Sequence, residues 1–404
     1  MVTITRFSSF TLILGLIAGL CGCDLVANIL LAPDEGADGG GHIVDEPITM
    51  SIGMVAPLTG RFASSSGLSM ERGFLVARDE INEFELNPVR IEFIIEDNQS
   101  TTEGTIAAFE RLIDAGVPAI VGLAVSTHAK QAFPIAQENK VVAFSPISSA
   151  AGLSSIGDYI FRAALAVDRL NPAGVRTTHA LLGYERVALI YDAADVFSTS
   201  SNQYFAATLK ELGVEVTTMQ TFQTGDTDFT AQLTEIMESN PDAVFISALD
   251  MEAVSIMIQG REIGTTARYI TPQLRDGVAR LAGAAAEGTV TFTNWSSTLD
   301  NPINQNFVER YRTTYGIEPD TRAAQSYATL FILYVAILEA LGQSSDIVAP
   351  DAMAIRDALA MTKDFDTNMG PFSFDSNGEA IHKEVVLVVK DGRLVLFGDG
   401  DMLD

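Results

Sequence analysis

Two hydrophobic periods alternate along most of the chain, and this pattern predicts strands that alternate with helices. The segment from Ser51 to Ala56 is short and apolar, is bounded by Pro57, and is typical of a buried strand. After a polar turn, apolar residues recur at spacings of three and four, which predicts a helix with one buried face at Met70, Phe74, Ala77, Ile81 and Phe84.

The same alternation continues toward the carboxyl terminus. Further strands are predicted at Val89–Ile95, Ala119–Gly122, Val141–Phe144, Val187–Tyr191, Val214–Thr218, Ala243–Ser247, Tyr269–Thr271 and Thr289–Phe292. Helical segments between strands indicate parallel sheets with right-handed crossovers. Because this is too many strands for one comfortable sheet, we expect an α/β protein with two Rossmann-like lobes. The end of the chain, Gly370 to Gly398, is predicted to be rich in β-structure.

The longest helical stretch, Ala323 to Gly342, is almost wholly apolar. Its hydropathy alone would permit a membrane span. Its length and the charged Glu339 favour a helix buried between the two lobes instead.

Composition excludes several classes of function. The formal charge of −27 leaves no basic stripe for nucleic acid and no polybasic membrane contact. The only cysteines, Cys21 and Cys23, lie near the amino terminus, so the folded part offers no thiolate metal site or disulfide. The four histidines are scattered without metal-ligand spacing, and we expect no metal and no cofactor.

The amino terminus carries an export signal. Residues 1–22 combine a thin positive start at Arg6 with an apolar stretch too short to cross a bilayer. The sequence Leu20-Cys21-Gly22-Cys23 resembles the lipobox of bacterial lipoproteins, which implies that Cys23 becomes the acylated first residue. The alternative is ordinary secretion with cleavage nearby. Residues 23–48, rich in Gly, Asp and Glu, are predicted to be a flexible acidic linker.

The segment IGMVAPLTGRFASSSGLSMERGFLVARDEIN resembles the opening of the type I periplasmic binding proteins, in the branch that carries leucine, isoleucine and valine. Later segments, from IEFIIEDNQSTTEGTIAAFERLID to MGPFSFDSNGE, are similar to that family in the same order. The resemblance implies the periplasmic binding protein-like I fold, with two lobes joined by a hinge of three crossovers. It implies that residues 49–166 plus 294–362 form lobe one and residues 167–293 plus 363–404 form lobe two.

Two hydroxyl-rich loops in lobe one follow predicted strands and precede helices. Hydroxyls beside helix amino termini suit an anionic group such as a carboxylate. The alternative is that these serines only cap helices, which uses the same geometry. In the family, the matching positions hold the ligand's carboxylate, and the residues here are Ser126, Thr127, Ile147, Ser148 and Ser149, with Ile147 contributing backbone only.

In lobe two the match to the family is less complete. Phe197 takes the place of an aromatic residue that either stacks on the ligand or fills the core. Gln273 stands nearest to the carboxylate that usually holds an α-ammonium group, and glutamine cannot neutralise that charge. Asp250 offers a carboxylate near another strand end. Either Asp250 supplies the missing charge and the ligand is an amino acid, or the ligand lacks an ammonium group.

No nucleotide loop, nucleophile motif or zinc motif stands in the required strand–turn–helix context, so nothing supports an enzyme on a Rossmann-like scaffold. The resemblance implies a lipid-anchored solute-binding protein that captures a small polar ligand between closing lobes. It implies delivery to the permease of an inner-membrane ABC importer, and a position facing the periplasm or the cell exterior. The alternative is a ligand-sensing receptor that uses the same fold for signalling.

Overall fold

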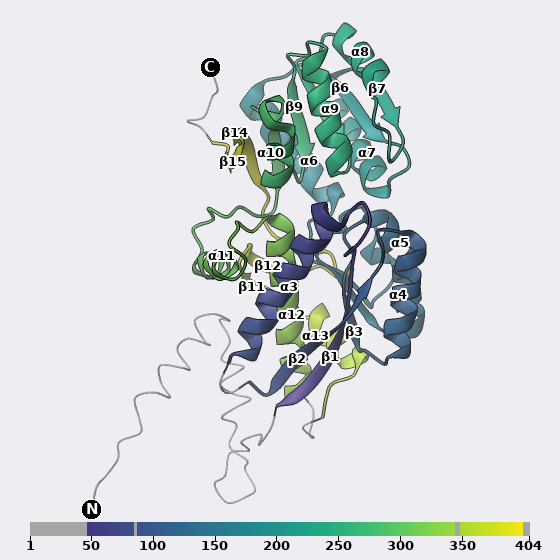
Figure 1. Cartoon of the computed structure of the whole chain (residues 1–404), viewed down its shortest axis with the longest axis vertical. Helices are drawn as coiled ribbons and strands as arrows, with labels where there is room; N and C mark the ends of the chain where they lie inside the picture. Colours follow the sequence, from purple (N-terminus) through teal and green to yellow (C-terminus); the bar gives the residue numbers. More distant parts are fainter. Residues whose placement is uncertain (1–46, 85–86, 344–347, 399–404) are drawn as a thin grey trace, which may run out of the picture.

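Strand β1 (Ile48–Ala56) runs through a five-stranded parallel sheet, and different helices cover its two faces (Figure 1). Ile52 and Met54 point into one hydrophobic cluster, whereas Val55 points into another on the opposite face. This alternation is the period of two that a strand buried on both sides requires. The computed structural model describes residues 47–84, 87–343 and 348–398. The predicted export signal, Cys23 and nearly all of the predicted linker lie outside those residues.

Lobe one is built on the sheet order β2-β1-β3-β4-β5. Its other strands are β2 (Val89–Asp97), β3 (Ala119–Gly122), β4 (Val142–Ser145) and β5 (Ile160–Arg162). Its helices are α3 (Leu68–Asn82), α4 (Thr102–Asp114), α5 (Ser126–Asn139), α11 (Pro302–Tyr315), α12 (Thr321–Gly342) and α13 (Ala352–Ala360), with a π-helical turn at Ala63–Gly67 and a 3₁₀ turn at Ser154–Ile156.

Lobe two is built on the sheet order β15-β14-β10-β9-β8-β6-β7. Its parallel strands are β6 (Arg186–Asp192), β7 (Glu215–Phe222), β8 (Ala243–Ser247), β9 (Arg268–Pro272) and β10 (Val290–Thr293), and β14 (Val385–Lys390) and β15 (Arg393–Leu396) add an antiparallel edge. Its helices are α6 (Val167–Leu182), α7 (Val196–Glu211), α8 (Thr230–Glu238), α9 (Asp250–Glu262) and α10 (Asp276–Ala282), followed by a 3₁₀ turn at Gly283–Ala286.

One predicted lobe boundary is wrong. We assigned residues 363–404 to lobe two, but β11 (Phe365–Thr367), β12 (Gly370–Phe374) and β13 (Ala380–Ile381) form a small sheet that packs into the core of lobe one. The cause is aromatic packing, because the Phe374 ring lies 5.6 Å from that of Phe144 and 5.1 Å from that of Phe161. The chain enters lobe two only after Ile381.

Helix α12 is also placed differently from our expectation. It packs inside lobe one against α3 and α13 rather than between the lobes. Its length and hydropathy would suffice for a membrane span. However, 83% of its apolar 18-residue segment is buried inside the protein. A Cβ added at Gly73 of α3 would lie 2.2 Å from the Ala323 carbonyl oxygen, so a glycine is required where the two helices cross.

Three stretches of chain connect the lobes, as the hinge prediction required: residues 163–166, 294–301 and 382–384. His382 links all three, since its Nε2 lies 3.1 Å from the Ala163 carbonyl oxygen and 3.2 Å from Asn294 Nδ2. Asn294 Oδ1 in turn accepts a hydrogen bond from Gln325 of α12. A polar cluster of one residue from each crossover therefore lies at the hinge.

Candidate functional site

The carboxyl ends of the parallel strands in both sheets face each other across the gap between the lobes, where open α/β sheets bind ligands. A small cavity lies there, with a volume of about 40 Å³ open to the centres of water-sized molecules. It is lined by Ala124, Val125, Ser126, Ile147, Ser149, Phe197, Ala248, Leu249, Asp250, Pro272, Gln273 and Arg322. Six of the eight residues expected at the site, all except Thr127 and Ser148, lie on its wall.

Ser126 joins the two hydroxyl loops of lobe one. It is the first residue of α5, and its Oγ accepts hydrogen bonds from the backbone N–H groups of Ser149 and Ala150, each at 3.2 Å. The hydroxyl hydrogen of Ser126 is thereby left to donate toward the cavity. A carboxylate placed here would also meet the positive end of the α5 dipole.

Ser148 stabilises a loop and does not line the cavity. It is 1% exposed, and its Oγ donates to the Leu123 carbonyl oxygen at 3.0 Å. This bond ties the loop after β4 to the end of β3. Ile147, its neighbour, lies on the cavity wall.

Thr127 holds the lobes together. Its Oγ1 donates to Asp195 Oδ1 at 2.8 Å and accepts from the Val196 N–H at 3.0 Å, at the start of α7 in lobe two. Both roles of the hydroxyl are therefore used by protein groups. Phe197, one residue further along, is half-buried and faces the cavity.

Asp250 is enclosed by arginines. Its Oδ2 lies 2.6 Å from Arg275 Nη2 and 2.7 Å from Nη1 of Arg322, which comes from lobe one. Arg275 also pairs with Asp320 at 2.6 Å, so the four side chains form a network across the cleft. Burial alone would raise the pKa of Asp250, but the two guanidinium groups outweigh burial and lower it to about 2.

Gln273 meets lobe one directly. Its Nε2 donates to Ser149 Oγ at 3.0 Å, which joins the two strand-end loops across the cavity. Its backbone φ of 57° is uncommon for a residue other than glycine. A strained backbone that aims a side chain into a cleft is typical of a binding position.

A second ion pair crosses the cleft beside the cavity. Arg61 of lobe one lies 2.5 Å from Glu252, a residue of α9 that is 2% exposed. Glu252 also accepts from the Gly225 N–H at 2.9 Å. Together with the Asp250 network, this contact shows that the lobes are closed on each other.

Sequence reasoning missed Arg275, Asp320 and Arg322. Arg275 follows Gln273 by two residues in the same loop, and this proximity was a usable signal. Asp320 caps α12 by accepting from the N–H groups of Arg322 and Ala323. An Asp just before a predicted helix was therefore a second usable signal. Neither signal indicates that the two arginines converge on Asp250.

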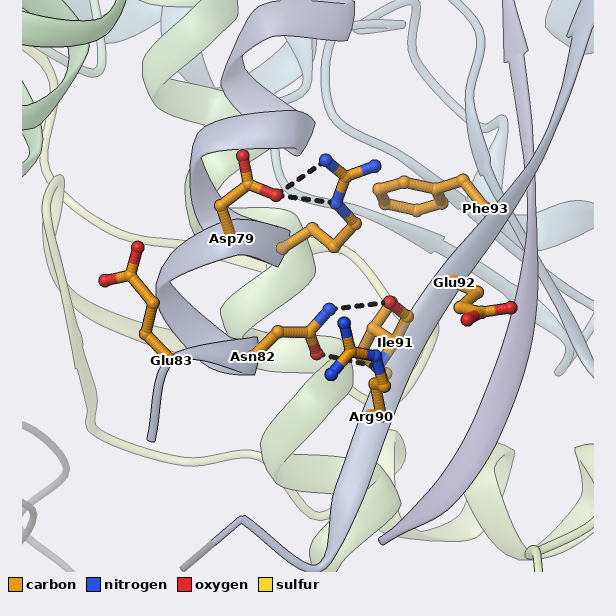
Figure 2. Close-up of a pocket in the computed structure, with 8 residues that line it drawn as sticks. Asp79, Asn82, Glu83, Arg90, Ile91, Glu92 and Phe93 are labelled. Carbon is orange, nitrogen blue, oxygen red and sulfur yellow. Dashed lines mark hydrogen bonds and ion pairs between the residues drawn. The ribbon is translucent and has the colours of Figure 1, made fainter. Parts of the chain in front are cut away.

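A larger hollow of about 550 Å³ lies on the outer edge of lobe one, between α3 and β2 (Figure 2). It is lined by the first half of β2, at the end of the strand away from the cleft. There the Asn82 amide donates to the Ile91 carbonyl oxygen and accepts from the Ile91 N–H, both at 2.9 Å (Figure 2). Asn82 thus pairs with the free side of an edge strand, which is a protective feature rather than a ligand site.

Within residues 47–84, 87–343 and 348–398, no group of three or more His, Cys, Asp or Glu side chains is arranged to hold a metal ion. The polar side chains on the cavity wall are the hydroxyls of Ser126 and Ser149, the Gln273 amide, and Asp250 and Arg322, which are paired with each other.

Comparisons with known proteins show which family the chain resembles. The Leu/Ile/Val-binding protein BraC3 of Rhizobium johnstonii is 25% identical over 363 residues, which cover 88% of this chain and 92% of that protein. The solved leucine binding protein of Thermotoga maritima is 28% identical with a TM-score of 0.79, covering 86% of this chain and 98% of that chain.

A second solved structure is the branched-chain amino acid transporter substrate binding protein of Streptococcus pneumoniae in complex with isoleucine. It is 26% identical with a TM-score of 0.78, covering 86% of this chain and 97% of that chain. The family model described as periplasmic binding protein matches residues 49–393, which include both lobes and the hinge. The chain therefore belongs to the periplasmic binding protein family, in agreement with the resemblance seen in its sequence.

Proposed function

We propose that this protein is the solute-binding component of an ABC importer. It captures a small ligand with a carboxylate group, an amino acid or a close analogue, between its two lobes. The observation that carries the proposal is the cavity between strand ends of both lobes, with Ser126 and Ser149 beside the start of α5. The names of the relatives, which bind leucine, isoleucine or valine, support the same class of ligand.

Closure provides the energetic basis of capture. A ligand in the cavity contacts Ser126 and Ile147 from lobe one and Phe197 and Gln273 from lobe two only when the lobes are together. Because it binds the closed form better than an open one, it shifts the population toward closure. The closed form is then the conformation that a permease would recognise.

A thermal-shift screen tests this function. Purified protein is heated with amino acids and with the corresponding 2-oxo acids and 2-hydroxy acids, each at about 100 times its expected dissociation constant. A bound ligand at that excess should stabilise the native state by about 2.7 kcal/mol and raise the melting temperature by several degrees. If no compound in these three classes raised the melting temperature, the proposed ligand class would be wrong.

We propose in addition that the protein is exported and anchored by a lipid on Cys23, facing the periplasm or the cell exterior. The position of Cys23 after Leu20-Cys21-Gly22 supports this. Cys23→Ala should move the protein from the membrane fraction to the soluble fraction without changing ligand binding, whereas Cys21→Ala should leave it at the membrane. Membrane association that survives Cys23→Ala would contradict the anchor.

A further inference from the structure

The cavity has one carboxylate on its wall among the described residues, and that carboxylate is already paired. Asp250 lies between Arg275 and Arg322, at 2.6 and 2.7 Å, and its second oxygen is 3.3 Å from Arg322 Nη2. The side chain of Asp250 is 14% exposed, and that of Arg275 is 7% exposed. Both charges of this pair are therefore largely removed from water.

A ligand ammonium group that took Asp250 as its partner would disturb this network. It would have to share the carboxylate with two guanidinium groups a few ångströms away, and like charges at that range repel. Displacing either arginine would leave a buried cation without its counter-ion, which is among the costlier changes in a protein interior.

The same network has more donors than acceptors. Arg275 Nε is buried and has no hydrogen-bond partner among the described residues. Arg322 Nη1 has three acceptors, Asp250, Ser66 Oγ and the Ser65 carbonyl oxygen, whereas its Nη2 makes only the long contact with Asp250. Of the two arginines only Arg322 lies on the cavity wall, and a ligand that adds an acceptor beside its Nη2 suits this network better than one that adds three more donors.

Gln273 is the remaining polar side chain of lobe two on the cavity wall. Its Nε2 is occupied by Ser149, and its Oε1 has no hydrogen bond among the described residues. This oxygen can accept from a hydroxyl or an amide, but as a neutral group it cannot offset a buried positive charge.

We propose that the ligand is a small carboxylic acid without an α-ammonium group, in which a hydroxyl faces Gln273 and Arg322 or a carbonyl oxygen faces Arg322. This inference rests on the proposed function and narrows its ligand class from amino acids and their analogues to 2-hydroxy or 2-oxo acids. The carboxylate lies at Ser126 and Ser149, and the uncharged end lies toward lobe two. Asp250 serves to hold Arg322 in place and to close the lobes.

Isothermal titration calorimetry with matched ligands tests the proposal. The full protein is titrated with leucine, 4-methyl-2-oxopentanoate and 2-hydroxy-4-methylpentanoate, which share a side chain and differ only at the second carbon. Phenylalanine and alanine, with their own 2-oxo and 2-hydroxy acids, extend the series to a large and a small side chain. In the series that binds, the acids without ammonium should bind at least tenfold more tightly than the amino acid.

The outcomes separate this inference from the proposed function. An amino acid that binds as tightly as its 2-oxo and 2-hydroxy acids, or more tightly, would overturn the inference and leave the proposed function intact. If none of the three series bound, the proposed function would fail and the inference would fall with it.

A charge-restoring variant adds a second readout. Gln273→Glu keeps the shape of the side chain and supplies a carboxylate, so it should shift the affinity ratio toward the amino acid at least tenfold. Gln273→Met is the matched control, since it removes the polar group without adding charge and should produce no such shift. Circular dichroism confirms that both variants fold. An unchanged ratio in Gln273→Glu would contradict the assignment of Gln273 to the uncharged end of the ligand.

Discussion

Arg322 Nη1 lies 2.7 Å from Asp250 Oδ2, and this ion pair joins the first turn of α12 in lobe one to the first turn of α9 in lobe two. The two helices belong to different lobes and have no covalent connection near this point. The pair therefore exists only while the lobes are closed, and its strength contributes to the balance between open and closed forms.

Removing the cation should open the ligand-free protein. Arg322→Gln deletes one partner of the buried carboxylate, and a hydrogen bond to a charged group contributes about 1.5–3 kcal/mol. Small-angle X-ray scattering should then give a larger radius of gyration than for the wild type. Arg111→Gln is the matched control, because its ion pair with Glu96 lies within lobe one. Equal radii for wild type and Arg322→Gln would show that this pair does not govern closure.

Two serines of lobe one should differ in their effect on ligand binding. Ser126→Ala removes a hydroxyl on the cavity wall and should weaken ligand binding by about 1–3 kcal/mol, together with some loss of stability because two backbone N–H groups lose their acceptor. Ser148→Ala removes a buried hydroxyl that bonds to the Leu123 carbonyl oxygen away from the cavity, so it should lower unfolding stability by about 1 kcal/mol and leave affinity unchanged. Calorimetry and urea unfolding of both variants measure the two effects. A loss of affinity in Ser148→Ala equal to that in Ser126→Ala would contradict this division.

Acid should destabilise the protein through two histidines. Burial lowers the pKa of His128 and of His382 to about 4, from an ordinary value of 6.5. Between those values the unfolded chain binds more protons than the folded one, so stability falls as pH decreases from about 6.5 toward about 4. Each histidine should contribute a slope of up to about 1.4 kcal/mol per pH unit in that window.

Urea unfolding at several pH values measures this slope, and His128→Gln and His382→Gln should each reduce it by about one proton. The comparison between variant and wild type isolates the histidine from carboxyl groups such as Glu80, whose pKa burial raises. A slope that neither variant changed would show that these rings are protonated in the native state.

The edge strand of lobe one should depend on Asn82. Asn82→Ala leaves both backbone groups of Ile91 without their side-chain partner, which should cost about 1–3 kcal/mol of unfolding stability and increase aggregation. Ligand affinity should not change, because the strand's other end faces the cleft. Asn139→Ala is the control, since its exposed amide bonds only to the Ile135 carbonyl oxygen of its own helix. Equal stability of the two variants would remove the proposed role of Asn82.

The elements of the site that follow from local pattern were predictable from sequence. Ser126, Ile147, Ser149 and Gln273 all lie in the segments that follow β3, β4 and β9, and in a parallel sheet the ends of strands meet at one edge. What could not be predicted is the direction of a side chain within such a loop. Ser148 and Ser149 are adjacent and chemically identical, yet one bonds to Leu123 and the other faces the cavity.

Contacts between residues far apart in the sequence could not be predicted either. Arg322 and Asp250 are 72 residues apart, and neither position has a local pattern that indicates the other. The small sheet of β11, β12 and β13 was misplaced for the same reason, because its aromatic residues fit either core by hydrophobicity alone. Only the three-dimensional packing of Phe374 against Phe144 and Phe161 decides between the lobes.

The triple crossover has a consequence for the order in which the chain can fold. The core of lobe one combines residues from β1 to β5 with Trp295, Phe307 and Ala380, whereas lobe two contributes its main strands between them. As the chain is synthesised from its amino terminus, lobe one begins first but lacks α11, α12 and β12 until almost the whole polypeptide has emerged. Lobe two can assemble its five parallel strands earlier and then lacks only the edge strands β14 and β15, so the lobe that starts the chain completes its core after the central sheet of the other lobe.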